Sequence, residues 1–253
     1  MRRGFSIFPA AEGQSSERVW RGPSLPDLLV RWPPAGWAGA ACPAGQVVTR
    51  GARVVVVLDA VYAYPMGVEL WIRFVTSPRL SQPLKRSLNM GVSFVEQMRR
   101  HAPDLSADDL PPEVRAHVEA MGFGQEQLPR ISVLRGAGEE LPLQGVMTET
   151  EVGPSLVEVG HVQAGPSADV ILAWLNPLPE ETAELTLSVS WPEAGLPEGR
   201  VPLDVHELRA RAPSAQKLLD IDMVAEMHEH LAEMDEAMAD LYPPDHPSAD
   251  PTQ

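Results

Sequence analysis

The sequence predicts a mainly β protein: an antiparallel, immunoglobulin-like β-sandwich with a short inserted helix and a long C-terminal amphipathic helix. Three segments carry this prediction, because apolar and polar residues alternate in them with a period of two. Their apolar positions are Val68, Leu70, Ile72 and Phe74; Leu88, Met90, Val92 and Phe94; and Leu185, Leu187, Val189 and Trp191. Successive strand side chains point to opposite faces, so each segment has one buried face. Parallel sheets, covered on both faces, read instead as unbroken apolar runs.

The other expected strands have weaker patterns. Residues 54–58 are apolar on both faces, which predicts a central strand, and the proline and glycine of residues 64–67 predict a turn into the strand that follows. Further short strands are predicted at residues 131–134, 143–148, 156–162 and 170–175. Many short strands separated by turn residues favour a sandwich over a parallel sheet covered by helices.

Three helices are expected. Residues 111–122 begin with two prolines and end at a glycine, which predicts a short helix inside an insertion around 97–130. Asp204 and Glu207 have the spacing of a capping box at a helix start. The strongest helical pattern covers residues 214–242, where apolar residues repeat every three or four positions.

These patterns divide the chain into four segments. Residues 1–46 form an irregular leader rich in proline and glycine, in which Trp20, Trp32 and Trp37 favour docking of at least a part. Residues 47–212 form the sandwich with its insertion. Residues 213–242 form the acidic, methionine-rich helix, and residues 243–253 are expected to be a disordered tail, since prolines end the helix.

The charge of the chain argues against nucleic-acid binding. It has 20 Lys and Arg against 35 Asp and Glu, a net charge of −15, and residues 213–253 hold ten acids and one base. Nucleic-acid binding needs clustered basic residues. The basic stretch around Arg73, Lys85 and Arg99 is interpreted as solvated strand edges and loops, with a binding patch as the alternative.

Cysteine content and hydropathy predict a cytoplasmic protein. The single cysteine, Cys42, excludes an intrachain disulfide and fits a reducing compartment. The first residues resemble a twin-arginine signal, but Pro9 and Glu12 interrupt them before an apolar stretch of signal length develops. No run approaches 18 apolar residues, so we expect no membrane contact.

Several strand–turn motifs resemble those of a group of uncharacterised actinobacterial proteins. The matching stretches are residues 64–70 (YPMGVEL), 174–179 (WLNPLP) and 191–198 (WPEAGLPE), followed by residues 201–211. The resemblance covers about residues 47–212 without the insertion. It implies a β-rich domain and carries over no catalytic residue, since the group has no established activity.

No catalytic signature is found in the sequence. Serine-hydrolase, Walker, dinucleotide-binding and zinc-protease motifs are missing. Cys42 has no base placed beside it and is interpreted as a small apolar filler. His101, His117, His161, His206 and His246 are scattered without a recognisable partner. We therefore expect no cofactor and favour a non-enzymatic protein.

The best metal-ligating pattern is in the C-terminal helix. Glu226, His230 and Glu233 lie at positions i, i+4 and i+7, along one side of a helix, and could hold a divalent cation. A solvated helix flank explains the same three residues. Without a fourth ligand in the pattern, we predict no metal site there.

The C-terminal helix is the predicted binding element. Its apolar seam consists of Val224, Met227, Leu231, Met234, Met238 and Leu241. This seam could pack on the protein's own domain, or bind a protein partner or a second copy in a coiled-coil-like pair. Methionines suit an adaptable contact surface, and flanking acids disfavour a parallel self-pair. Contact with its own domain or with a basic partner is therefore favoured.

The function expected from the sequence is protein binding, as a module or scaffold acting through this helix. Two alternatives stay open. One is a hydrolase or carbohydrate-active enzyme that uses loop carboxylates, since such carboxylates need to meet only in space. The other is a structural subunit of a larger assembly.

Overall fold

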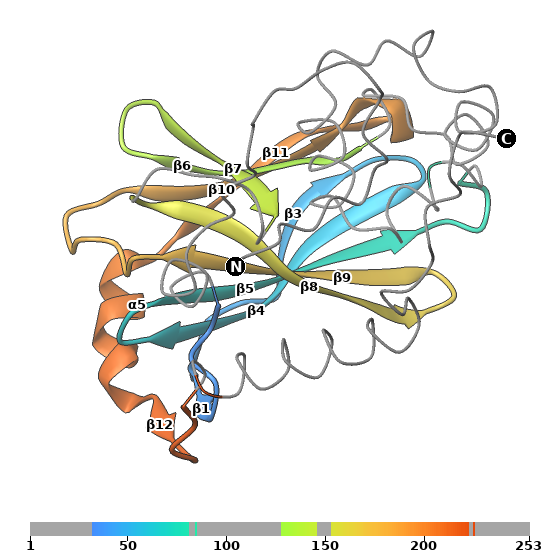
Figure 1. Cartoon of the computed structure of the whole chain (residues 1–253). Coiled ribbons are helices and arrows are strands. Elements are labelled where there is room, and N and C mark those ends of the chain that lie inside the picture. The colour runs from blue at the N-terminus through green and yellow to red at the C-terminus, as the bar shows by residue number, and fades with distance from the viewer. Residues whose placement is uncertain (1–31, 81–83, 85–127, 146–152, 223–224, 226–253) are drawn as a thin grey trace, which may run out of the picture.

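The computed structural model describes residues 32–80, 84, 128–145, 153–222 and 225. Most of these residues form strands, which confirms the mainly β class (Figure 1). The strands are β1 (Trp37–Ala38), β2 (Ala40–Cys42), β3 (Gln46–Arg50), β4 (Val54–Tyr64), β5 (Gly67–Thr76), β6 (Arg130–Arg135), β7 (Glu139–Gly145), β8 (Ser155–Gly165), β9 (Ala168–Asn176), β10 (Leu185–Trp191), β11 (Leu196–Leu203) and β12 (Gln216–Lys217). The helical segments are η2 (Pro192–Ala194), α5 (Val205–Arg211) and η3 (Ala212–Ser214).

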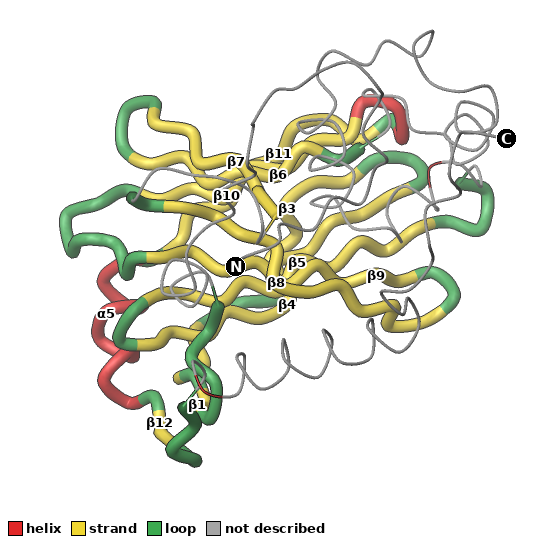
Figure 2. Tube along the Cα trace, viewed as in Figure 1, coloured by secondary structure: helices red, strands yellow, loops and turns green. Residues whose placement is uncertain are grey.

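Ten of the strands belong to one sheet, which curls into a half-barrel (Figure 2). Its order is β11-β10-β6-β7-β8-β9-β5-β4-β2, and β3 pairs with β4 beside β2. All of these pairs are antiparallel except β7 with β8, which is parallel. The predicted immunoglobulin-like antiparallel sandwich is therefore wrong. The protein has one curled mixed sheet in place of two stacked antiparallel ones.

Strand β7 is the reason that the sheet is continuous. Residues 139–142 pair with β6, and residues 143–145 pair with β8. This one strand thus joins the two halves of the sheet by backbone hydrogen bonds. A strand with one buried face has the same alternating sequence in a sandwich and in a curled sheet, so the alternation could not distinguish the two folds.

The predicted strand positions are confirmed where the structure describes them. In β5 the side chains of Val68, Leu70, Ile72 and Phe74 are fully buried, and in β10 the predicted apolar positions 185, 187, 189 and 191 are buried as well. Tyr64 pairs with Gly67 across the predicted turn. Strand β4 is flanked by β5 on one side and by β2 and β3 on the other. The predicted strand at residues 88–95 lies outside the described residues.

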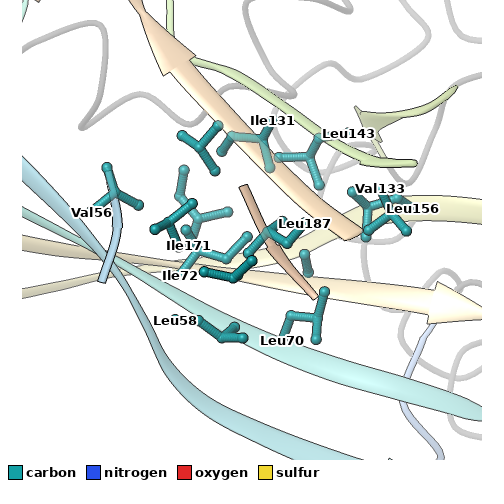
Figure 3. Close-up of a cluster of buried hydrophobic side chains, with 14 of the residues drawn as sticks. Val56, Leu58, Leu70, Ile72, Ile131, Val133, Leu143, Leu156, Ile171 and Leu187 are labelled. Atoms are coloured by element: carbon teal, nitrogen blue, oxygen red, sulfur yellow. The ribbon is translucent and has the colours of Figure 1, made fainter. Parts of the chain in front are cut away.

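A hydrophobic core fills the hollow of the half-barrel (Figure 3). Leu70 and Ile72 of β5 lie near Ile171 of β9 and Leu187 of β10, so both halves of the sheet contribute. A T-shaped ring contact in the core joins Phe74 and Trp191, whose centroids are 6.2 Å apart at 82°. The interior is packed with side chains, as expected of a small barrel.

The two ends of the curled sheet meet at β3 and β11. The hydroxyl of Thr49 donates to the carbonyl of Pro197 at 2.7 Å. A Cβ atom at Gly199 would lie 2.1 Å from the carbonyl oxygen of Val48, so the two backbones touch where glycine allows it. This contact covers part of the open side of the core.

Helix α5 begins as the sequence predicts. The carboxylate of Asp204 accepts the N–H of Glu207 at 3.0 Å, and Val205 and Leu208 are buried against the core. The predicted long helix is wrong at its start: after η3, residues 216–217 form β12, which pairs with β1, and residues 218–222 are not helical. The predicted insertion helix lies outside the described residues, as does the long helix beyond residue 222, except for Ala225.

None of the described helices has the length and apolar character needed to cross a membrane.

Candidate functional site

The predicted partner-binding seam lies outside the described residues. This holds for Val224, Met227, Leu231, Met234, Met238 and Leu241, and also for the weak metal candidates Glu226, His230 and Glu233. The structure does describe residues 218–222, which precede the seam, and Ala225. Ala225 is helical, and its N–H donates to the carboxylate of Asp222 at 3.1 Å, the arrangement of a helix N-cap.

Two irregularities in the strands decide which side chains share a face. Strand β4 has a bulge at Asp59, and β8 has a bulge at Val159. An extra residue in a strand reverses the alternation beyond it. In β4, positions 54, 56 and 58 face the core before the bulge, and positions 61 and 63 face it afterwards. Tyr62 and Tyr64 are thereby turned to the outer face of the sheet, opposite the core.

This outer face carries an aromatic cluster, which consists of Tyr62 and Tyr64 on β4, Trp71 on β5 and Trp174 on β9. Tyr62 and Trp71 form a T-shaped pair with centroids 5.7 Å apart at 65°. Tyr64 and Trp174 form a second T-shaped pair, 5.5 Å apart at 74°. We call these four residues the outer aromatic cluster.

Glu69 joins the two aromatic pairs. The Tyr64 hydroxyl donates to Oε2 of Glu69 at 2.9 Å, and the indole Nε1 of Trp71 donates to its Oε1 at 3.0 Å. One carboxylate therefore fixes a ring from each pair. Burial raises the pKa of Tyr64, and the charge of Glu69 raises it further. The phenol thus stays a protonated hydrogen-bond donor, as a positioned contact group rather than a base.

The turn between β4 and β5 lies beside the cluster and is hydrogen-bonded to the end of β9 and to the residues that follow it. The side-chain amide of Asn176 and the backbone N–H of Leu178 both donate to the carbonyl of Met66, at 2.8 Å and 2.9 Å. A Cβ atom at Gly67 would lie 2.5 Å from the ring of Trp174, so glycine lets the indole pack against the turn. The aromatic cluster therefore lies beside a turn that hydrogen bonds and close packing fix to the end of β9.

A charged pair lies beside the cluster on the same face. The guanidinium of Arg73 pairs with the carboxylate of Asp59, the residue that forms the bulge. The Nε of Arg73 is buried and has no hydrogen-bond partner among the described residues. The outer face thus offers aromatic surface, a carboxylate and one spare N–H donor.

A second polar group lies on the inner face of β8 and β9. It consists of Glu158, His161 and Asp169, of which Glu158 and Asp169 are buried. The Nε2 of His161 lies 3.4 Å from Oδ1 of Asp169. The interpretation of His161 as a scattered histidine without a partner is therefore wrong. The bulge at Val159 turns His161 to the same side of β8 as Glu158.

The chemistry of this inner group is limited by its surroundings. Burial raises the pKa of Asp169, although the charge of His161 lowers it in part. A carboxyl with a raised pKa beside an imidazole is an arrangement that acid–base catalysis uses. However, Ile171 and Leu156 of the packed core lie directly beside these residues on the same face. In the described parts of the chain, no three His, Cys, Asp or Glu residues are grouped as metal ligands.

Cys42 packs as a side chain at the edge of the core. Its thiol is half-buried, and its Sγ lies 3.6 Å from the carbonyl of Ala40. Burial raises the pKa of Cys42, and the nearby charge of Glu207 acts in the same direction. The thiol form is therefore favoured over the nucleophilic thiolate.

Comparison with known proteins adds no family. No protein-family model matches the chain, and neither the curated proteins nor the solved structures give a significant match. The resemblance to the actinobacterial group stays a prediction.

Sequence reasoning missed both the outer aromatic cluster and the inner polar group. A signal for the inner group was present, because Glu158 interrupts the apolar positions of its strand two residues after Leu156. Asp169 likewise precedes the apolar run 170–175 on the core-facing side. The outer aromatic cluster could not be found in this way, since its faces depend on a bulge that the sequence pattern does not reveal.

Proposed function

We propose that this chain is a non-enzymatic protein-binding module whose contact element is the amphipathic segment 224–241. The observation that carries the proposal is the helix start at Asp222 and Ala225, where the described body ends. Ala225 is helical and does not belong to another strand of the sheet. Its apolar residues repeat with helical spacing, which suits contact through one face.

The negative charge of residues 222–241 indicates which kind of partner surface the segment would bind. Residues 222–241 contain seven acidic residues and no Lys or Arg. An apolar seam on an otherwise acidic segment favours a partner surface that is apolar where the seam contacts it and basic around that contact. Because the single cysteine suits a reducing compartment, we place this interaction in the cytoplasm.

The proposal is tested by capture with the full chain as bait. The wild type is compared with Met227→Glu combined with Met234→Glu, which adds charge to the seam, and with Glu229→Gln combined with Glu236→Gln, which leaves the seam intact. We expect a protein that binds the wild type and the flank variant but not the seam variant. That protein is then purified and titrated against all three chains.

Two results would overturn the proposal. One is that every captured protein is also retained by the seam variant. The other is that purified candidates bind the wild type and the seam variant with equal affinity. Light scattering on the same samples tests the seam as a contact between copies, because a mass above the 27.5 kDa of one chain that falls in the seam variant means self-association.

A second candidate function is a hydrolase, favoured by the neighbouring His161 and Asp169 on the inner face. This alternative needs water and substrate to reach the inner polar group. A panel of ester and glycoside substrates, assayed with the wild type and with His161→Asn, tests it. Turnover by the wild type that is lost in the variant supports the hydrolase, and no turnover on any substrate argues against it.

A further inference from the structure

Four buried hydrophobic residues lie outside the hydrophobic core. They are Tyr64, Val157, Val170 and Trp174. The strand register places them on the outer face, where Val157 pairs with Trp174 and Val170 pairs with Arg73. The exposed fractions of Val157 and Val170 are 1% and 4%. A sheet face that is open to water does not bury valines to this extent, so a second layer covers this part of the face.

The described chain leads to this same face. A Cβ atom at Gly39 would lie 2.6 Å from the ring of Tyr64, which places the β1–β2 connection against the outer aromatic cluster. Strand β1 in turn pairs with β12. Beyond β12, the side chain of Ile221 packs 3.1 Å from the position of a Cβ at Gly36. The helix that Asp222 caps therefore starts beside the outer face.

The length of the next segment matches the face. Residues 224–241 are 18 residues, and a helix of that length is about 27 Å long. Strand β5 has ten residues, which span roughly 33 Å, and four neighbouring strands are about 14 Å wide. A single helix laid along β5 and β9 thus covers the buried outer residues without passing beyond the sheet.

The chemistry of the two surfaces is complementary. The seam carries three methionines, Met227, Met234 and Met238, whose thioethers make favourable contacts with aromatic rings. The outer face offers the half-buried Trp71 and Leu172 as partners. The buried Nε of Arg73 still lacks an acceptor among the described residues, and the segment is rich in carboxylates.

We propose that residues 224–241 dock on the outer face of β4, β5, β8 and β9 of their own chain. The docked seam is held on the outer aromatic cluster and released when a partner competes for it. The release step rests on the proposed function, whereas the docking itself does not. The contact is autoinhibitory, since the same apolar residues cannot contact the sheet and a partner at once.

Hydrogen exchange on the full chain tests the docking, at a concentration where light scattering gives the mass of one chain. Amides of residues 227–238 are expected to exchange at least roughly tenfold more slowly than in an unstructured peptide. Leu172→Glu places a charge at the centre of the docking face and should remove this protection. The matched control, Thr186→Glu, places the same charge on the outward side of β10 and should leave it unchanged. Unprotected amides in the wild type, or protection that survives Leu172→Glu, would overturn the docking.

A second measurement is independent of how the variants fold. A photo-crosslinking amino acid is introduced at Met234, and crosslinked peptides are identified by mass spectrometry. We expect crosslinks to peptides of β5 and β9 within one chain. Crosslinks to β6, β10 or β11, or a product with twice the mass of the chain, would contradict docking on this face of the same chain.

The two proposals fail in different ways. If the amides of residues 227–238 are unprotected but a partner binds through the seam, the docking is wrong and the function stands. If they are protected but charge in the seam does not weaken any interaction, the docking stands and the function is wrong. With both correct, Leu172→Glu increases the affinity for the purified partner, because the competing contact is removed.

Discussion

Two carboxylates show how the same chemical group has different roles on the two faces of the sheet. Glu69, on the outer face, accepts hydrogen bonds from Tyr64 and Trp71 and fixes both rings. Asp169, on the inner face, is buried with a raised pKa. The carboxylate of Glu69 positions the side chains around it. The charged form of Asp169 is destabilised by burial.

Replacing Glu69 by Ala should destabilise the fold by about 1–3 kcal/mol, because two donors, one on the buried Tyr64 and one on the half-buried Trp71, lose their acceptor. Glu69→Gln keeps one acceptor oxygen and should be less destabilising. Urea unfolding followed by tryptophan fluorescence measures both. Glu140→Ala, which removes an exposed glutamate from β7, is the control and should change the free energy of unfolding little. Equal effects of Glu69→Ala and Glu140→Ala would show that Glu69 does not fix the cluster.

The raised pKa of Asp169 gives stability a defined pH dependence. The folded protein holds this proton more tightly than the unfolded chain, so ionisation of Asp169 destabilises the fold above its folded pKa. We expect Asp169→Asn to be more stable than the wild type at about pH 7, and this difference to shrink toward about pH 4. Unfolding in urea at both pH values measures it.

Asp220 is a control of opposite sign for this prediction. Its side chain is exposed, and hydrogen bonding to Lys217 lowers its pKa. Asp220→Asn should therefore give no gain in stability at neutral pH. An Asp169→Asn variant that is no more stable than the wild type at neutral pH would contradict the role of burial at this residue.

At the scale of single elements, the sequence was sufficient wherever one strand could be considered alone. The alternation of Leu185 to Trp191 predicted the buried face of β10, and the spacing of Asp204 and Glu207 predicted the start of α5. Both patterns depend on neighbours within a few residues. Local geometry decides them, so no knowledge of the tertiary fold was needed.

The bulges at Asp59 and Val159 could not be predicted from local sequence patterns. An extra residue reverses the alternation beyond it, and nothing in residues 54–64 reveals whether the strand has one. Tyr62 and Tyr64 could therefore not be assigned to a face, and His161 could not be joined to Asp169. Pairing with the neighbouring strands supplies this information, and that pairing is a property of the whole sheet.

The cap of α5 gives a prediction at this scale. Asp204→Ala removes the side-chain acceptor of the Glu207 N–H and should destabilise the protein by about 1 kcal/mol. Thermal unfolding followed by circular dichroism measures the change. Asp220→Ala, at an exposed position in an ion pair, should have a smaller effect. Equal shifts in the two variants would mean that the cap contributes no specific stability.

At the scale of the whole molecule, the contact between β3 and β11 holds the half-barrel closed on one side. It depends on close approach of two backbones, because Val48 leaves no space for a side chain at position 199. Thr49 adds a hydrogen bond to Pro197 across the same gap. Residues about 150 positions apart in the sequence meet here, and no local pattern predicts such a contact.

Gly199→Ala should therefore destabilise the protein strongly, by about 2–4 kcal/mol, since the backbones of β3 and β11 must separate. Gly153→Ala is the matched control, because a Cβ there meets nothing within 4 Å. Urea unfolding of both variants measures the difference. A Gly199→Ala variant as stable as the control would mean that β3 and β11 are not in close contact.

The divided pairing of β7 has a consequence for how the molecule loses its structure. Both halves of the curled sheet need β7 for their hydrogen bonds. If the halves separate, one end of β7 loses its backbone partner. Partial melting of one half would thus expose polar backbone in the other. The two halves are expected to denature together in a single cooperative transition, so that probes in β5 and in β10 report the same midpoint.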